Sequence, residues 1–232
     1  MAGTAAVHGT PGDGIPEDDT RDDGGLRARW LRTLGAVRDS DTPDPAPYAE
    51  NLLTRWSEPR RSYHTTDHLL AVLEHIDTLA PHADDPEAVR LAAWFHDAVY
   101  RPERSENEER SAVLAVRALT EAGVRAGVTE EVARLVRLTV THDPAPGDHN
   151  GEVLCDADLA ILAAEPETYA AYTRAVREEY SFVPDDAFRA GRAAVLRQLL
   201  DLERLFRTPH GAAAWEERAR ANLAAELETL GN

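Results

Sequence analysis

The sequence predicts an all-α protein, and three observations support this prediction. Apolar residues recur at helical, three- and four-residue spacing from residue 26 onward. Ala, Leu, Arg and Glu, which favour helices, dominate this part of the chain, and alternating strand patterns are nearly absent. The 232 residues, 43% of them hydrophobic, show no internal repeat and no second composition regime. We therefore expect one helical domain over residues 26–232.

Residues 1–25 are predicted to form a disordered acidic tail. Their only large aliphatic side chains are Val7 and Ile15, too few to offset the entropy lost on ordering the segment. Six acidic residues against Arg21 give the segment a net charge of −5 out of the formal −17 of the chain.

Proline and capping residues indicate where the helices of the first half begin. Thr65 or Thr66 can cap one helix. Pro86 opens the next, at the first helical position, where its missing N–H costs nothing. Ser105 can cap another, with Glu108 as its capping-box partner. The helices expected in this half span residues 26–37, 47–56, 65–79, 86–98 and 105–121.

The second half continues the helical pattern. The helix that starts at Thr129 is expected to end near His142, because Pro144 disfavours helical geometry at the residue before it. A loop rich in Pro, Gly, Asp and Asn follows through Gly151. The remaining helices are expected at residues 153–164, 167–179, 185–206 and 212–230.

Charge and cysteine content exclude several classes of function. With 42 acidic and 25 basic residues, the chain is a poor partner for nucleic acids and anionic membrane surfaces. It has no apolar run near the roughly 20 residues that span a bilayer and no signal-peptide pattern, so we expect a cytoplasmic protein. The single cysteine, Cys155, excludes an internal disulfide framework and a multi-thiolate zinc site. Imidazole and carboxylate remain as metal ligands, and the oligomeric state is left open.

Histidine and aspartate recur at the ends or buried faces of the predicted helices. Asp97 is the most telling, because it follows the least polar helix of the chain, where an unpaired carboxylate would cost several kcal/mol. A metal ion would remove this penalty and use the adjacent His96 as well. The four clusters are His64 with His68, His96 with Asp97, His142, and Asp156 with Asp158.

These residues resemble a known family. His68, His96-Asp97 and Asp158, in this order, are similar to the H…HD…D signature of the HD superfamily of metal-dependent phosphohydrolases. The surrounding segments extend the resemblance, over about residues 46–230, to the small bacterial phosphohydrolases of this superfamily, and imply a single helical HD-domain bundle. They are residues 61–68, 94–100, 107–112, 156–159 and 219–223.

The resemblance implies roles for individual residues. His68, His96, Asp97 and Asp158 would hold a divalent metal, with Mn, Fe, Co, Ni and Zn all compatible with the ligand set. His64 would be the general acid, as in the Tyr-His-Asn-x-x-His motif of cyclic-nucleotide phosphodiesterases, although Thr65 stands here in place of the Asn.

Other residues keep two interpretations. His142 could bind substrate phosphate or a second metal, or simply end its helix. Asp156 competes with Asp158 as a ligand or could orient one. Glu108 could position water or act as base besides its capping role, and Arg61 could neutralise phosphate or lie on the surface. Residues 177–180 resemble an Arg-x-Glu-Tyr block of the family, for which we expect a structural role.

The function expected from the sequence is hydrolysis of a small phosphate ester, with nucleotides among the candidates. The metal would activate water and polarise the phosphoryl group while His64 protonates the leaving group. One alternative is a di-iron oxygenase of the HD type, for which His142 and Asp156 would be the spare ligands. Another is a helical metal- or nucleotide-binding protein without catalytic turnover.

Overall fold

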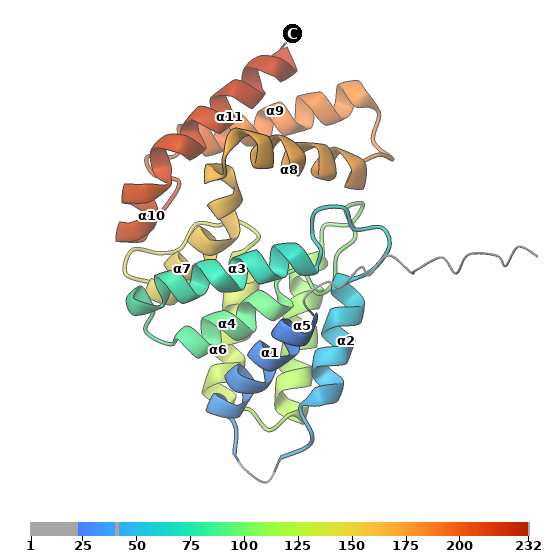
Figure 1. Cartoon of the computed structure of the whole chain (residues 1–232), viewed down its shortest axis with the longest axis vertical. Helices are drawn as coiled ribbons and strands as arrows, with labels where there is room; N and C mark the ends of the chain where they lie inside the picture. The colour runs from blue at the N-terminus through green and yellow to red at the C-terminus, as the bar shows by residue number, and fades with distance from the viewer. Residues whose placement is uncertain (1–22, 40–41, 232) are drawn as a thin grey trace, which may run out of the picture.

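The computed structural model describes residues 23–39 and 42–231, and its helices confirm the all-α prediction (Figure 1). Within these residues the extended contacts are limited to an isolated bridge between Arg38 and Val124. Most of the predicted tail lies outside the described residues. The elements are α1 (Asp23–Val37), α2 (Ala46–Trp56), α3 (Thr66–Leu79), η1 (Ala80–His82), α4 (Pro86–Phe95), α5 (Asn107–Glu121), α6 (Ala126–Leu138), α7 (His149–Leu159), η2 (Ala160–Ala163), α8 (Pro166–Glu179), α9 (Asp185–Asp201), α10 (Pro209–Ala214) and α11 (Glu216–Gly231).

The helices form two layers. Helices α1–α7 make up the lower body in Figure 1, and α8–α11 lie across its top. Each layer has its own apolar cluster, and the ring of Trp215 packs against both. The connection between the layers is α7 with the short η2, which leads the chain upward into α8.

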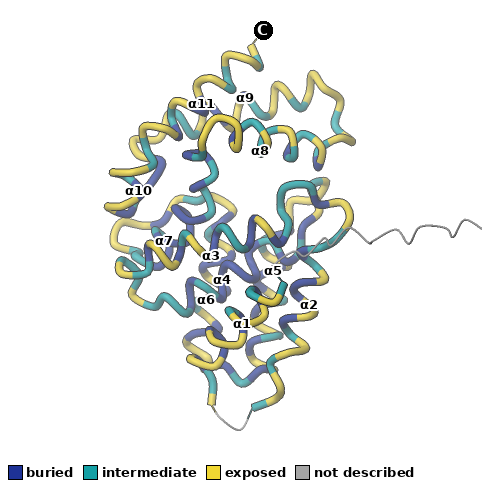
Figure 2. Tube along the Cα trace, in the orientation of Figure 1, coloured by how far each residue is buried: buried dark blue, intermediate teal, exposed yellow. Residues whose placement is uncertain are grey.

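Helix α4 is the centre of the lower body, as its uniformly apolar sequence predicted. Seven of its ten residues are buried, including Trp94 and Phe95 with no exposed surface. Asp85 caps its N-terminus by accepting a hydrogen bond from the N–H of Ala88, and Pro86 follows at the first helical position. Figure 2 shows the contrast with α9 and α11, which are largely exposed.

Several predicted boundaries differ from the structure. Helix α1 begins at Asp23, so residues 23–25 are helical rather than part of the tail. The capping box of Ser105 and Glu108 is wrong, because α5 starts at Asn107 after Glu106, whose side chain makes no cap hydrogen bond. Instead the Asn107 side chain bonds the backbone of residues 101 and 104, which closes the preceding loop.

The later helices are also shorter or divided. Helix α6 occupies residues 126–138 rather than 129–142, because the turn at Gly123, with φ of +76°, starts it earlier. Helix α9 ends at Asp201, where the guanidinium of Arg220 donates hydrogen bonds to the backbone carbonyls of residues 200, 202 and 203. The helix predicted over residues 212–230 is two helices that meet at Trp215. In the part of the chain described here, no helix is both long and apolar enough to cross a membrane.

Candidate metal centre

His68 is placed by the start of α3. The Thr65 side chain caps this helix by accepting a hydrogen bond from the N–H of Asp67, which sets His68 in the first helical turn. The imidazole is buried and packs against the rings of Trp56 and Tyr63, with centroids 6.2 and 4.7 Å away. This packing leaves the ring with little freedom to turn.

His96 follows the last turn of α4 and is oriented by the backbone. Its Nδ1 lies 2.8 Å from the carbonyl oxygen of Ala93, a hydrogen bond that requires the proton on Nδ1. The lone pair of Nε2 is therefore the one offered to the centre. The ring is 1% exposed and lies against Trp56, whose Nε1 donates to the carbonyl of Trp94.

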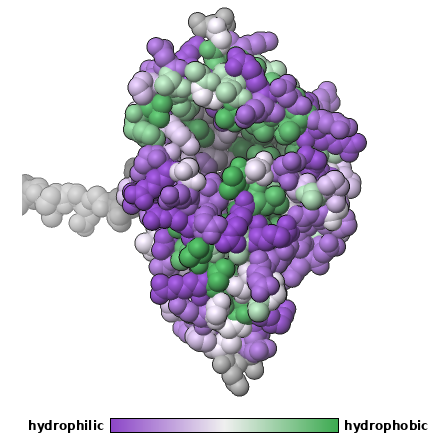
Figure 3. Space-filling model, turned by 180° about the vertical axis from the view of Figure 1, so that it is seen from behind, coloured by the Kyte–Doolittle hydropathy of each residue, from purple (hydrophilic) through white to green (hydrophobic). Residues whose placement is uncertain are grey.

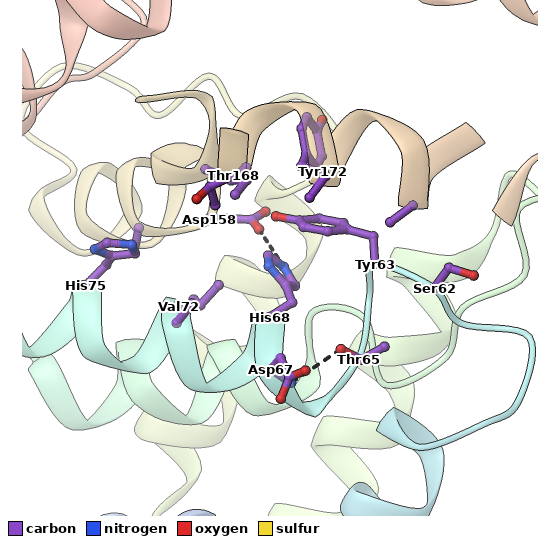
Figure 4. Close-up of a pocket in the computed structure, with 15 residues that line it drawn as sticks. Ser62, Tyr63, Thr65, Asp67, His68, Val72, His75, Asp158, Thr168 and Tyr172 are labelled. Atoms are coloured by element: carbon purple, nitrogen blue, oxygen red, sulfur yellow. Dashed lines mark hydrogen bonds and ion pairs between the residues drawn. The ribbon is translucent and has the colours of Figure 1, made fainter. Parts of the chain in front are cut away.

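Asp158, at the end of α7, brings the two imidazoles together. Its Oδ1 lies 3.1 Å from Nε2 of His68 and 3.6 Å from Nε2 of His96. Figure 4 shows this carboxylate directed at His68. Asp97 completes the cluster, with Oδ2 3.3 Å from Nε2 of His96. The four residues predicted as ligands therefore lie near one another, although they come from three separate segments; Asp97 reaches the cluster through its contact with His96.

The donor atoms of this cluster fit a divalent cation. Nε2 of His68 and Nε2 of His96 are buried and make no hydrogen bond. Buried polar atoms without partners are costly and uncommon, and a metal ion would satisfy both nitrogens. His68, His96 and Asp158 each offer a ligand atom within 4.8 Å of the others.

The electrostatics of the cluster are consistent with metal binding. Burial lowers the pKa of His68, which favours the neutral imidazole that metals require. Burial disfavours the charged form of Asp158, yet the neighbouring His96 and the hydrogen bond from His142 hold its pKa well below the usual range. Burial likewise opposes ionisation of Asp97, but His96 and His64 keep the pKa of Asp97 low. Both carboxylates are therefore anionic at neutral pH.

His64 lies beside this cluster and is held by a residue that sequence reasoning placed in a structural block. Its Nδ1 is 2.7 Å from Oε2 of Glu179, at the end of α8, and its Nε2 is 3.7 Å from Oδ2 of Asp97. Oε1 of Glu179 accepts from the backbone N–H groups of residues 62, 63 and 64. Tyr100 donates to Oε2 at 2.8 Å. Both carboxylate oxygens of Glu179 therefore accept hydrogen bonds from His64 or its surroundings.

Arg61 has a different role from the one predicted. Its guanidinium donates to the backbone carbonyls of His64 and Asp97, at 3.0 and 2.8 Å, and stacks over the rings of Trp56 and Tyr100. The side chain has no exposed surface. Both sequence interpretations, a phosphate-binding group and a surface residue, are therefore wrong. Arg61 positions the segments that carry His64 and Asp97.

His142 lies beside the candidate centre. Its Nε2 lies 2.8 Å from Oδ2 of Asp158. The backbone of His142 has φ of +50°, a left-handed conformation that is costly for a residue with a side chain. This conformation follows the end of α6 and directs the imidazole to the carboxylate.

Asp156 and Glu108 are not brought to the centre. Asp156 is two residues from Asp158 on α7 and accepts hydrogen bonds from the N–H groups of Arg207 and Thr208 and from the Thr208 hydroxyl. It anchors the start of α10 and is neither a spare metal ligand nor an orienting group, which corrects that prediction. Among the described contacts, Glu108 makes none with the four ligands; its charge acts instead on Tyr180.

Two pockets flank the centre. The first, of about 450 Å³, is lined by His68, Asp158 and residues of α3 and α8 (Figure 4). The second, of about 620 Å³, is lined by His64, His142 and residues of α8 and α9. Tyr63 and Tyr172 line both pockets and stand between them, with ring centroids 4.7 Å apart. The first pocket therefore reaches two of the candidate ligands, and the second reaches His64 and His142 beside them.

Comparison with known proteins gives one result. Residues 65–164 match the family model described as HD domain. This segment contains His68, His96, Asp97 and Asp158. The chain matches no curated protein and no solved structure.

Proposed function

We propose that this protein hydrolyses a small phosphate ester at a single divalent metal, because residues 65–164 match the HD domain, a domain type that generally serves metal-dependent hydrolysis. The metal would be held by His68, His96, Asp97 and Asp158. The observation that carries the proposal is the convergence of two buried imidazole nitrogens, which make no hydrogen bond, on two carboxylates. A helical scaffold would not keep this costly arrangement for packing alone.

The residues around the centre would have different roles in hydrolysis. A bound divalent cation supplies Lewis acidity, which lowers the pKa of water and polarises the phosphoryl oxygen. His68 presents a neutral nitrogen for the cation. Burial opposes the charged form of His96, but Asp97 and Asp158 raise its pKa well above the ordinary value, so a cation bound there would displace the Nε2 proton. Asp97 and Asp158 would balance the charge of the cation. The water oxygen attacks phosphorus, the bond from phosphorus to the ester oxygen breaks, and His64 gives its proton to the leaving oxygen.

His64 is suited to this role by its surroundings. Burial lowers its pKa, but the charges of Asp97 and Glu179 outweigh burial and raise the pKa above the ordinary value of 6.5. A larger fraction of His64 is then protonated at neutral pH, as a general acid requires. Its Nδ1–H is held by Glu179, so Nε2 is the atom from which the proton leaves.

The structure gives less support to the oxygenase alternative. Two irons require more ligands than the four residues of the proposed centre, and the spare candidates were His142 and Asp156. His142 bonds Asp158, but the hydrogen bonds of Asp156 run to the start of α10. One of the two spare ligands is thereby committed elsewhere.

Metal analysis combined with a phosphatase screen tests the proposal. Protein purified without chelator is assayed for bound metal and for activity on alkyl phosphates, aryl phosphates and nucleotides. We expect Asp97→Ala to lose both metal and activity, while Asp201→Ala, at the exposed end of α9, keeps both. Activity that survives the loss of metal and of Asp97 would refute the proposal. Two irons with oxygen-dependent turnover would favour an oxygenase, and a bound ligand without turnover would favour a binding protein.

A further inference from the structure

We propose that the 620 Å³ pocket between α8 and α9 binds the leaving group of the ester, and that this leaving group is an apolar alcohol rather than a nucleoside. This inference rests on the proposed phosphohydrolase function. It concerns a part of the molecule that lies mostly outside residues 65–164, where the family match ends.

The walls of this pocket are largely hydrophobic. Helix α8 and the turn after it contribute Val176, Tyr180 and Val183, and α9 contributes Phe188 and Val195. Its volume falls in the range that accommodates a small organic molecule. Val195 remains 45% exposed, although it is a large apolar residue. Seen from behind, hydrophobic residues also gather around a hollow between the upper and lower layers (Figure 3).

The position of the pocket relative to the centre assigns it to the leaving group. His64, the proposed general acid, lines this pocket and not the smaller one. His68 and Asp158 line the smaller pocket, on the other side of Tyr63 and Tyr172. In phosphoryl transfer the attacking and leaving oxygens lie roughly in line on opposite sides of phosphorus. The organic group that leaves toward His64 therefore extends into the larger pocket.

The charges on the wall argue against a nucleotide. The arginine on this wall is Arg192. Its guanidinium donates to both carboxylate oxygens of Glu226, at 2.7 and 2.9 Å, and to the hydroxyl of Tyr172 at 3.2 Å. Its charge is thus already compensated and is not offered to a polyphosphate. Among the described lining residues, no carboxamide or carboxylate side chain is present to read the edge of a base. An apolar group needs neither feature.

A series of primary alkyl phosphates provides the test. Ethyl phosphate, 2-(1-naphthyl)ethyl phosphate and adenosine 5′-monophosphate all release a primary alcohol, so differences in kcat/KM report mainly on binding of the organic group. We expect kcat/KM for the naphthylethyl ester to exceed that for ethyl phosphate by at least about 10-fold, because the pocket buries its larger apolar surface. We also expect it to exceed kcat/KM for the nucleotide. A preference for the nucleotide, or equal rates for all three esters, would overturn the inference.

Matched variants locate the effect. Val195→Asp places a charge on the pocket wall, and Val113→Asp places the same charge on α5, where Val113 is 57% exposed. We expect Val195→Asp to remove the preference for the naphthylethyl ester over ethyl phosphate, and Val113→Asp to keep it. Equal effects of the two variants would contradict the assignment.

A binding measurement separates this inference from the proposed function. Calorimetry with 2-(1-naphthyl)ethylphosphonate, which cannot be hydrolysed at its P–C bond, reports on the pocket without turnover. Binding that Val195→Asp weakens, in a protein that hydrolyses none of the esters, would refute the function and retain the pocket. Hydrolysis without phosphonate binding would refute the pocket and retain the function.

A second, independent observation concerns histidines that the proposed function does not use. We infer that His82, His149 and Glu152 form a separate site for a zinc-like divalent cation. Their ligand atoms lie within 4.8 Å of one another. Nε2 of His82 is 2.6 Å from Oε2 of Glu152, and the two imidazole centroids are 4.8 Å apart.

The location of this cluster suits a structural cation. His82 ends η1, whereas His149 and Glu152 are three residues apart in the first turn of α7 and therefore share a face. Asp84 lies 3.2 Å from Nδ1 of His149 and can orient that imidazole. Two imidazoles and one carboxylate are a ligand set that zinc accepts. The cation would cross-link the turn before α4 to the start of α7.

Zinc stoichiometry tests this second site without any assay of activity. In the Asp97→Ala background, where the proposed catalytic metal is lost, we expect one zinc per chain to remain. Adding His82→Ala should remove it, whereas adding His210→Ala, an exposed histidine on α10, should not. No bound zinc in the Asp97→Ala protein, or zinc that survives His82→Ala, would refute the site. The same data show whether a second equivalent of metal in the wild type belongs to the catalytic centre.

Discussion

The carboxylate of Glu179 accepts a hydrogen bond from Nδ1 of His64 at 2.7 Å, across 115 residues of sequence. Its other oxygen accepts from three consecutive backbone N–H groups, at 2.8–2.9 Å, in the segment that carries His64. One side chain at the end of α8 therefore fixes both the loop and the imidazole. This links the upper layer of helices to the candidate metal centre in the lower body.

Replacing Glu179 by Gln should impair catalysis through His64. The amide cannot stabilise a protonated imidazole, so the pKa of His64 falls and the acid form is lost at lower pH. We expect kcat to fall by about 10–100-fold and the basic limb of the pH–kcat profile to shift to lower pH. Metal content should stay unchanged.

The neighbouring residue provides the control for this prediction. Glu178 is exposed, so Glu178→Gln removes the same charge one residue away from the contact. Its pH–kcat profile should match that of the wild type. A Glu179→Gln enzyme with reduced kcat but an unshifted profile would show that Glu179 acts only as a structural support.

Glu179 should also make stability depend on pH. Burial disfavours its charge, but the hydrogen bonds from His64 and the backbone outweigh this and lower the pKa from 4.5 to about 2. Because the pKa is lower in the folded state, the stabilisation is present above about pH 4.5 and is lost as the pH falls toward 2. Urea unfolding should show a stability gap between wild type and Glu179→Gln, on the order of 2 kcal/mol near neutral pH, that closes on acidification. A gap that does not change with pH would contradict this account.

Arg61→Ala should destabilise the fold. The substitution leaves the backbone carbonyls of His64 and Asp97 without their donors and opens a space beside Trp56. We expect the free energy of unfolding, measured by denaturant titration, to fall by about 2–4 kcal/mol. Arg104→Ala, at an exposed position, should change stability by less than about 0.5 kcal/mol. Similar losses for the two variants would show that the buried contacts contribute little.

The two aspartates of α7 should separate stability from metal binding. Asp156→Ala removes the acceptor for the N–H groups of Arg207 and Thr208, so we expect a loss of about 2–3 kcal/mol in stability with metal binding retained. Asp158→Ala removes the carboxylate between His68 and His96, so we expect metal affinity to fall at least about 10-fold. Metal titration and denaturant unfolding of both variants check the pair. Loss of metal from Asp156→Ala in the folded protein would contradict the assignment.

Local features of the sequence were sufficient to predict most of the helices and to name four candidate ligands. The cap at Thr65 and the start at Pro86 lie where they were predicted, because capping depends on neighbouring residues. The starts of α5 and α6 were missed, because they depend on contacts made by Asn107 and on the turn at Gly123. The order His68, His96-Asp97, Asp158 could be recognised without knowing how the segments pack.

By itself, the sequence determined the helical class and the chemistry of the candidate centre, because both depend on residue types and on their spacing along the chain. Tertiary structure alone decided that Glu179 holds His64, that Arg61 is buried rather than free for phosphate, and that Asp156 anchors α10. Only the packing of α8 and α9 over the lower helices produced the apolar pocket beside His64. Such contacts join residues far apart in the chain, and their geometry depends on how whole helices pack, which no local pattern encodes.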